Sequence, residues 1–176
     1  SSFGLGLPEG CTFVGQEIHK TTYALGVLRL LAHGVQNFEI FNEDSFTHWR
    51  SRTYGDDVDI EKFDYIISFP PLGLKRPSSE ADLEYEWGSS RLSMSDYLLS
   101  NGANSSAAQG SIVACLFPES VLFEGGATGR QREQLISMGR INTVVSLPGG
   151  LLHVSGMKLC IIVFNSIDDW SDEIRF

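Results

Sequence analysis

Short apolar runs alternate along the chain with segments whose apolar residues have helical spacing. The spacing of Tyr23, Val27 and Leu30 predicts a helix over Lys20–His33. Gly34 is a good stop for that helix. The other clear patterns predict strands over Cys11–Glu17, Phe38–Phe41, Phe63–Ser68, Gly110–Phe117, Ile141–Leu147 and Lys158–Phe164, and a helix over Gly129–Gly139.

Two segments have weaker patterns. Leu74–Leu92 is charged, rich in Ser and Glu, and long, so we expect a lid, a binding loop or a disordered segment. Asp96–Ala108 is a candidate helix, although Gly102 and a run of Ser and Asn weaken it.

The connection between the last two predicted strands decides their direction. Only Pro148-Gly149-Gly150 and a short linker separate them, and parallel strands need a crossover of about a dozen residues or more. We therefore expect a terminal antiparallel hairpin. Alternating strands and helices before it predict one α/β domain over residues 1–176, with a doubly wound, mostly parallel sheet and a reversed strand at one edge.

The strand over Phe63–Ser68 marks the expected functional site. Its run of Phe, Tyr and Ile is typical of a strand that is buried on both faces. Pro70 and Pro71 follow almost at once, and neither can donate a backbone hydrogen bond, so the strand must end there. Ligands of open α/β sheets bind just outside the carboxyl ends of strands. The loop that begins at Phe69 is therefore the predicted place of chemistry.

The charge balance limits how the chain can bind nucleic acid. Thirteen Lys and Arg against twenty-two Asp and Glu give a net charge of −9. Phosphate contacts need basic residues, so this chain is a poor stand-alone DNA binder, and another chain or segment must supply positive surface. A local basic patch and an ordinary mixed surface both remain open; the patch candidates are Lys75, Arg76, Arg91, Arg130, Arg132 and Arg140.

The cysteines and the hydropathy pattern indicate which metal, disulfide and membrane features to expect in this protein. Cys11, Cys115 and Cys160 lie in apolar runs without the spacing of a metal site or of a disulfide framework. We expect buried thiols in a reducing compartment and no bound metal. No apolar run approaches the ~20 residues that span a bilayer, so we expect a cytoplasmic protein with no membrane contact.

Several ordered segments together resemble the adenine-N6 DNA methyltransferases, and most closely the modification subunit of type I restriction–modification systems. The resemblance covers nearly all of the chain from about residue 13 onward. The matching segments are Gly15-Gln16-Glu17-Ile18, Asn42-Glu43-Asp44-Ser45, Phe63–Ser68 with Pro70-Pro71, Ser79–Asp82 through Trp87-Gly88, Ser95-Asp96-Tyr97, Pro118–Phe123 with Gly125-Gly126-Ala127, Arg132-Glu133, and Leu147–Gly150 with Lys158.

The resemblance implies a class I, Rossmann-like methyltransferase fold that uses S-adenosylmethionine. It implies that Glu17 accepts hydrogen bonds from the ribose hydroxyls of this cofactor and that Asp44 contacts its adenine. Gly4 and Gly6 resemble a remnant of the family's glycine-rich cofactor turn. It further implies DNA as substrate, bound through a complex with a specificity subunit, and a restriction subunit as a further partner.

The catalytic loop departs from the family pattern. The family has Asn, Asp or Ser, then Pro-Pro, then Phe or Tyr, whereas this chain has Phe69-Pro70-Pro71-Leu72. The family's polar residue accepts a hydrogen bond from the adenine amino group, and Phe69 has no acceptor. Losing such a contact costs about 2.7–4 kcal/mol. The family's aromatic residue stacks on the flipped base, which Leu72 cannot do, at a cost of about 1–3 kcal/mol.

Two interpretations follow for the function: a methyltransferase domain with a degenerate catalytic loop, or a catalytically inactive subunit kept for assembly or partner binding. Simpler roles also remain open for each site residue. They are a strand-end acid for Glu17, a helix cap or turn residue for Asp44, a structural turn for Pro70 and Pro71, and core packing or a plug for Phe69.

The N-terminal part of the sequence also departs from the family pattern. The family has a strand, the glycine-rich turn and a helix before its Gly-Gln-Glu segment, and here only residues 1–10 precede the corresponding strand. Either residues are absent or the cofactor site is broken. We favour absent residues, because a sheet without its central strand would leave backbone groups unpaired.

Overall fold

The structure is a computed structural model, and it describes residues 11–43, 52–54, 57–59, 63–69, 107–152, 156–165 and 173–176. The chain forms two compact units, Ser1–Glu61 and Lys62–Phe176. Each unit is described by itself, and the single-domain interpretation stays a prediction. Among the described residues, no helix is both long and apolar enough to cross a membrane.

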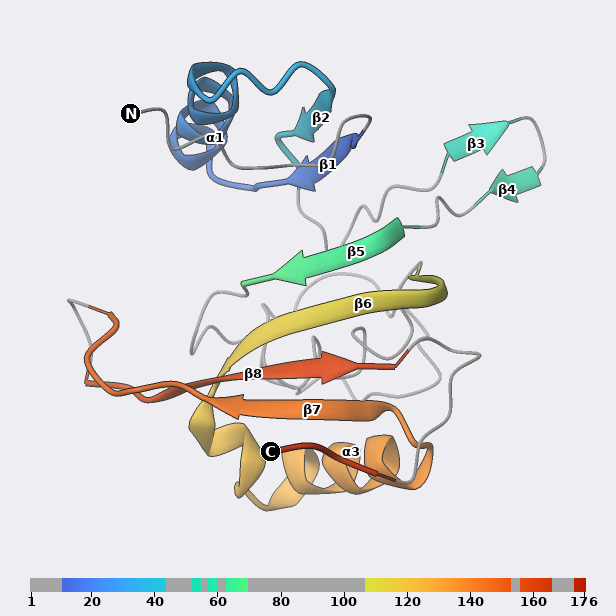
Figure 1. The fold of residues 1–176 in the computed structure, drawn as a ribbon, viewed down its shortest axis with the longest axis vertical. Coiled ribbons are helices and arrows are strands. Elements are labelled where there is room, and N and C mark those ends of the chain that lie inside the picture. Colours follow the sequence, from blue (N-terminus) through green and yellow to red (C-terminus); the bar gives the residue numbers. More distant parts are fainter. Residues whose placement is uncertain are drawn as a thin grey trace, which may run out of the picture. The chain divides into compact units, whose positions relative to one another are not determined.

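The first unit contains a β-α-β arrangement (Figure 1). Strand β1 (Phe13–Gln16) and strand β2 (Phe38–Phe41) pair in parallel, with Phe13 opposite Phe38 and Gln16 opposite Phe41. Helix α1 (Lys20–Ala32) connects them. These are the strands and the helix that the spacing of apolar residues predicts, so this part of the prediction is confirmed.

Helix α1 ends where Gly34 predicts. Gly34 has a φ of 72°, a backbone conformation that residues other than glycine rarely adopt. Its N–H donates to the Leu31 carbonyl at 3.0 Å, and the Val35 N–H donates to the Leu30 carbonyl at 3.0 Å. These two bonds form a Schellman motif, which satisfies carbonyls that the last helical turn would leave without a partner.

Strands β3 (Arg52–Tyr54) and β4 (Asp57–Asp59) form an antiparallel pair that the apolar pattern does not predict. Each has only three residues, too few for an alternation of apolar and polar positions to be recognised. The one available signal is Gly55-Asp56 between them, a dipeptide typical of hairpins.

The second unit is built on a four-stranded sheet (Figure 1) with the order β5-β6-β8-β7. Strands β5 (Phe63–Ser68) and β6 (Ala107–Pro118) are parallel. Strand β8 (Leu159–Phe164) is antiparallel to β6 and to β7 (Ile141–Ser146). The sheet is therefore mixed, with one parallel and two antiparallel strand pairs, and the α/β fold class and the antiparallel β7–β8 hairpin are confirmed.

Two details of this sheet differ from the prediction. The reversed strand β8 lies inside the sheet, between β6 and β7, because the chain returns beside β6 rather than beyond β7. Strand β6 begins at Ala107, so the last residues of the predicted helix Asp96–Ala108 belong to a strand instead. Pairing of Ala107 with Phe63 outweighs the helix propensity of alanine there.

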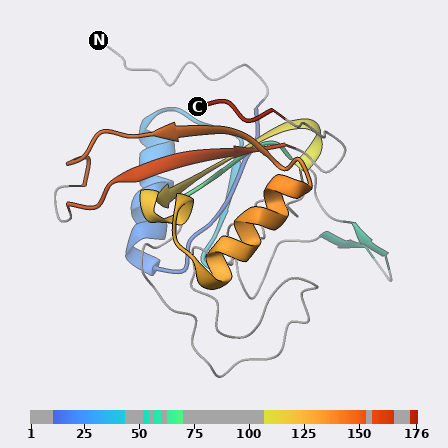
Figure 2. The same ribbon diagram turned by 90° about the horizontal axis from the view of Figure 1, so that it is seen from below.

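Helix α3 (Gly126–Ser137) and the short 3₁₀-helix η1 (Glu119–Leu122) connect β6 to β7, and α3 lies across one face of the sheet (Figure 2). Helix α3 begins three residues before the predicted start. It ends as α1 does: Gly139 has a φ of 62°, and the Arg140 N–H donates to the Leu135 carbonyl at 2.9 Å.

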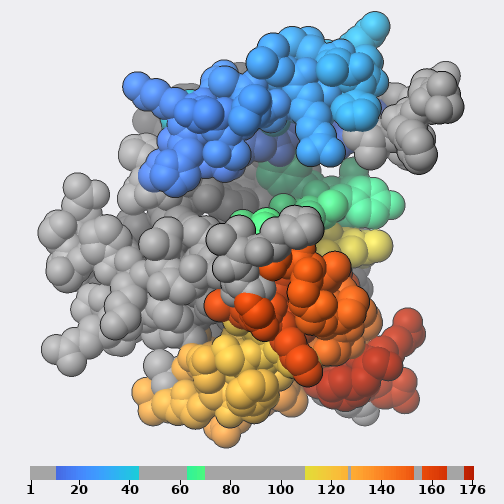
Figure 3. Space-filling model, turned by 90° about the vertical axis from the view of Figure 1, so that its left-hand side faces the viewer, coloured from blue at the N-terminus to red at the C-terminus, as the bar shows by residue number. Residues whose placement is uncertain are grey.

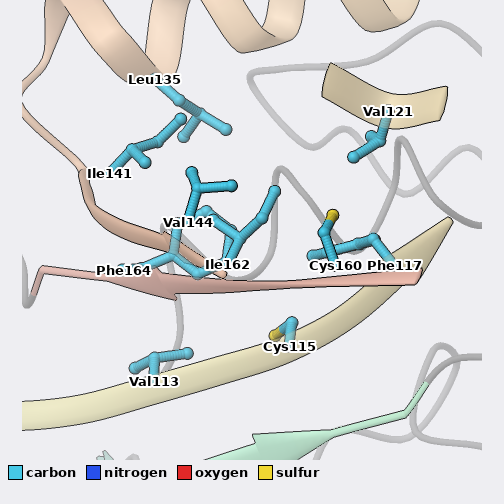
Figure 4. Packing of buried hydrophobic residues seen from close by; sticks show 10 residues of the cluster. All are labelled: Val113, Cys115, Phe117, Val121, Leu135, Ile141, Val144, Cys160, Ile162 and Phe164. Carbon is cyan, nitrogen blue, oxygen red and sulfur yellow. The ribbon is translucent and has the colours of Figure 1, made fainter. Parts of the chain in front are cut away.

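The core of the second unit lies between the sheet and these two helices (Figure 4). Val113, Cys115 and Phe117 alternate along β6 with residues of the opposite face, and all three are buried. They pack with Val121, Leu135, Ile141, Val144, Cys160, Ile162 and Phe164. Burying each large side chain of this kind stabilises the fold by about 1.5–3 kcal/mol.

The prediction that β5 is buried on both faces is wrong. Ile66 packs against the core, but Tyr65 and Ile67 are exposed on the other face. The reason is that β5 is the edge strand of its sheet and that α3 covers only one face.

The last residues of the chain extend the sheet beside β7. The Val144 N–H donates to the Arg175 carbonyl at 2.8 Å, and the Arg175 N–H donates to the Asn142 carbonyl at 2.9 Å. In Figure 3 residues 173–176 (red) lie directly beside the orange hairpin strands.

Candidate functional site

The predicted site residues fall into two groups. Glu17 and Phe69 lie within the described part of the chain, each directly after a strand. The other predicted residues lie outside it: Gly4, Gly6, Asp44, Pro70, Pro71 and Leu72.

Glu17 follows β1 at its carboxyl end, and hydrogen bonds fix both its side chain and its backbone. Its Oε1 accepts from the His19 N–H at 2.7 Å. Its N–H donates to the Phe41 carbonyl at 3.0 Å, and its own carbonyl accepts from Asn42 Nδ2 at 2.7 Å. The glutamate therefore has a defined orientation at the strand end rather than the freedom of a surface acid.

Asn42 joins the two strand ends of this unit. It directly follows β2, and its Nδ2 also donates to the Ile18 carbonyl at 3.0 Å. No local sequence pattern indicates a role for Asn42, because its partners are more than twenty residues away in sequence. Asn42, the first residue of its motif, is thus bonded to the carbonyls of both Glu17 and Ile18.

The chemistry of Glu17 fits a ribose. A carboxylate has about four acceptor positions on its two oxygens, and the His19 N–H occupies one of them. The remaining positions can accept hydrogen bonds from two neighbouring hydroxyl groups, which are donors. The half-buried position of Glu17 strengthens such bonds relative to those of a fully exposed acid.

Phe69 directly follows β5, at the carboxyl end of this strand in the four-stranded sheet. Its side chain is 59% exposed, so it is not the core residue that one alternative proposes. Ser68 lies opposite Cys115 of the parallel strand β6. The chain therefore leaves β5 and β6 at the same edge of the sheet, with Phe69 after the first strand and Pro118-Glu119 at the end of the second.

Side-chain and backbone bonds tie this edge together. The Glu119 N–H donates to the Lys158 carbonyl at 2.9 Å, and Glu119 Oε1 accepts from the Ser146 hydroxyl at 2.5 Å. The corner after β6 is thereby fastened to both strands of the β7–β8 hairpin. The Leu147 N–H adds a bond to the Leu159 carbonyl at 2.9 Å.

The candidate basic patch is reduced by the structure. Arg140 is only 6% exposed, because it lies between the end of α3 and the buried start of β7. Arg132 uses its Nη1 to donate to two backbone carbonyls, those of Val121 and Glu124. Arg130 is exposed, and Lys75, Arg76 and Arg91 lie outside the described residues.

The thiols near this edge are chemically unreactive. Burial raises the pKa of Cys115 to about 12, and burial together with the charge of Glu119 raises the pKa of Cys160 to about 11. Such thiols stay protonated and are poor nucleophiles. The prediction of buried thiols is confirmed for these two residues and wrong for Cys11, which is exposed because β1 begins only at Phe13.

This chain is similar to a family of DNA methylases and to a methylase subunit of a restriction enzyme. The model of the family N-6 DNA Methylase matches residues 6–176. The methylase subunit of the type I restriction enzyme MpnII from Mycoplasma pneumoniae is 24% identical over 190 residues, which cover 94% of this chain and 32% of that protein.

Two solved structures share the fold. The methyltransferase subunit of a type I restriction–modification system from Streptococcus thermophilus matches with a TM-score of 0.78 at 23% identity, over 93% of this chain and 35% of that one. A Listeria monocytogenes protein described as a class I S-adenosylmethionine-dependent methyltransferase matches with a TM-score of 0.64 at 16% identity, over 93% and 48%.

The chain spans about a third of the length of the two type I subunits that it matches.

The two structural matches show that the Rossmann-like methyltransferase fold predicted from the sequence is present. Since the family model covers nearly the whole chain, this protein belongs to the N-6 DNA methylase family, alongside the methylase subunits of type I restriction enzymes.

Proposed function

We propose that this chain is the S-adenosylmethionine-dependent, adenine-N6 DNA methyltransferase domain of a type I modification subunit, with a degenerate catalytic loop. The observation that carries the proposal is Glu17, an oriented carboxylate at the carboxyl end of a parallel strand. Membership of the N-6 DNA methylase family gives the reaction class.

In this proposal Glu17 holds the ribose hydroxyls of the cofactor. Asp44 contacts the cofactor's adenine, and Gly4 and Gly6 belong to the turn beside it. When bound, S-adenosylmethionine supplies the methyl group. Asn42 acts as a positioning residue, because it fixes the Glu17 carbonyl at the end of β1.

The target adenine is handled by the loop Phe69-Pro70-Pro71-Leu72. The carbonyl of Pro70 remains an acceptor for the adenine amino group, whereas Phe69 has none to add. Leu72 can pack against the base without stacking on it. With one acceptor instead of two, less electron density is drawn toward the amino nitrogen, and transfer is expected to be slow.

The acidic charge of the chain agrees with the proposal that a different subunit binds the DNA. A net charge of −9 leaves little for phosphate binding, so a separate specificity subunit is proposed to hold and read the DNA. A restriction subunit is a further proposed partner, and the assembly is proposed to work in the cytoplasm.

One observation favours a second candidate function. Phe69 offers no acceptor where the reaction needs one, and its ring is largely exposed instead of being packed away. Such a loop also suits a catalytically inactive subunit that is kept for assembly or for binding a partner.

Calorimetry with S-adenosylmethionine on the full-length protein tests whether the protein binds the cofactor that the proposed reaction requires. We expect heat of binding and a thermal shift for the wild type, and loss of both for Glu17→Ala. Glu39→Ala is the matched control, because Glu39 is an exposed acid of the same unit that lies within β2 rather than at a strand end. No heat with the wild-type protein would end the methyltransferase proposal.

A second experiment repairs the catalytic loop. Phe69→Asn together with Leu72→Phe restores the acceptor and the stacking ring, so we expect methyl transfer to DNA to rise about a hundredfold or more. Leu72→Phe alone is the control and should give only the smaller part of the gain. If the cofactor binds and the repaired loop transfers no more than the wild type, the inactive-subunit candidate replaces the first.

A further inference from the structure

Phe123 is an exposed aromatic residue on a turn that is otherwise held firmly. It directly follows η1, at the corner where the chain leaves β6. Its side chain is 72% exposed. A large apolar ring in water contributes little to folding, so Phe123 can be replaced without loss of the core and its ring is available to a ligand.

Hydrogen bonds fix the backbone on both sides of this ring. The N–H groups of Phe123 and Glu124 both donate to the Ser120 carbonyl, at 3.0 and 2.8 Å. Arg132 Nη1 donates to the carbonyl of Val121 at 2.7 Å and to that of Glu124 at 3.0 Å. Val121 itself is anchored in the core.

Arg132 reaches this turn from helix α3, so a second element braces it. The ring of Phe123 is therefore presented to solvent by a backbone with little freedom. Binding a flat partner on such a ring loses less conformational entropy than binding on a mobile loop.

The turn lies at the same sheet edge as the catalytic loop. Strands β5 and β6 are parallel neighbours, with Ser68 opposite Cys115, and both leave the sheet at this edge. Phe69 follows the first strand and the Phe123 turn follows the second, within one unit. Two exposed phenylalanines thus follow the ends of two neighbouring strands.

We propose that Phe123 is a substrate-contacting residue that stacks on an unstacked nucleobase of the DNA, in the role that Leu72 cannot fill. This inference rests on the proposed function. Every nucleobase has a flat π-face, and stacking on an aromatic side chain is worth about tenfold to a hundredfold in affinity per base, independent of sequence. The ring contributes this affinity without positive charge, which suits a chain with a net charge of −9.

The test measures binding of a fluorescein-labelled single-stranded oligodeoxyadenylate to the full-length protein by anisotropy. Phe123→Ala and Phe123→Leu are expected to weaken binding about tenfold to a hundredfold, whereas Phe123→Trp retains it. The leucine variant separates stacking from apolar contact, because it keeps a large apolar side chain and removes the π-face. Phe123 is largely exposed, so none of the three changes disturbs the core.

Phe176→Ala is the matched control, since Phe176 is a 96% exposed phenylalanine of the same unit at the chain end beside β7. It should bind like the wild type. The inference is overturned if Phe123→Leu binds as tightly as the wild type, if the wild type does not bind the oligonucleotide, or if Phe123→Ala impairs only association with a partner subunit.

The cofactor calorimetry distinguishes failure of the stacking role of Phe123 from failure of the methyltransferase proposal. Heat with S-adenosylmethionine but no effect of Phe123 on oligonucleotide affinity refutes the stacking role alone. Absence of cofactor heat refutes the methyltransferase proposal, and a Phe123-dependent oligonucleotide affinity would still stand.

Discussion

The β1–α1–β2 part of the first unit and the β6–β8–β7 part of the second differ in burial. None of residues 11–43 is buried, and Leu25, Leu28 and Leu31 of α1 are more than half exposed. In the second part the strands, α3 and η1 enclose a continuous core that includes Phe117 and Phe164. Both parts have well-formed strands and a helix that ends in a Schellman motif.

The difference shows that local signals and burial have separate origins. Helical spacing, a terminal glycine and a short apolar run are enough to define an element. Burial needs further layers: the second part has a sheet of four strands, whereas two strands and one helix cannot enclose a side chain. Since most helical stability comes from tertiary packing, we expect α1 to open at a lower free energy than α3.

The largest expected effect comes from the core. Phe164→Ala should lower the free energy of unfolding of the full-length protein by about 3–5 kcal/mol, because it leaves a cavity among fully buried neighbours. Urea-induced unfolding followed by circular dichroism measures this change.

Leu28→Ala is the matched test in α1. Leu28 is 61% exposed, so its removal should change the free energy of unfolding by less than about 0.5 kcal/mol. A loss comparable to that of Phe164→Ala would mean that α1 is buried in the working protein, and the contrast between the two parts would then disappear.

Most strands could be predicted because their apolar runs are local. One exception arises where pairing with a distant strand decides: Ala107 and Ala108 lie in a strand although their neighbourhood is typical of a helix. The place of β8 between β6 and β7 could not be predicted either, since spacing gives the direction of a hairpin but not which strand it joins.

The candidate site shows the same limit. Glu17 and Phe69 could be placed because they directly follow predictable strands. The bonds of Asn42 to the carbonyls of Glu17 and Ile18, and of Arg132 to those of Val121 and Glu124, join residues from different elements, and no pattern in the sequence indicates them. The burial of Arg140 follows equally from packing at the end of α3.

The two helix-ending glycines offer a smaller and sharper comparison. Gly34→Ala and Gly139→Ala both place a Cβ on a residue with positive φ, which costs about 1–2 kcal/mol of strain. Native-state hydrogen exchange should show the full loss in global protection for Gly139→Ala. For Gly34→Ala the loss should be confined to the amides of α1 and Val35, because that helix opens on its own.

Gly26→Ala is the control within α1. An added Cβ there meets no atom within 4 Å, and the helix interior favours alanine over glycine by about 0.5–1 kcal/mol. Protection of the α1 amides should therefore rise. Equal global losses for Gly34→Ala and Gly139→Ala would show that the two units unfold together.

The smallest expected effect concerns the thiols. Burial raises the pKa of Cys115 to about 12 and that of Cys160 to about 11, above the ordinary value of 9.0. The folded protein therefore holds these protons more tightly than the unfolded chain. Their stabilising contribution is complete below pH 9 and is lost as the pH rises through 11 to 12, with a loss below about 1 kcal/mol per thiol at pH 9.5.

Alkylation by iodoacetamide at pH 8 tests the same comparison without changing the fold. Cys11 is exposed and should react in the native protein, whereas Cys115 and Cys160 should react only at the rate at which the second sheet opens. Mapping the modified residues by mass spectrometry gives both rates in one sample. Equal rates at Cys11 and Cys115 would contradict the stable core, since a buried, protonated thiol can be alkylated only after the residues that pack over this face of the sheet move away from it.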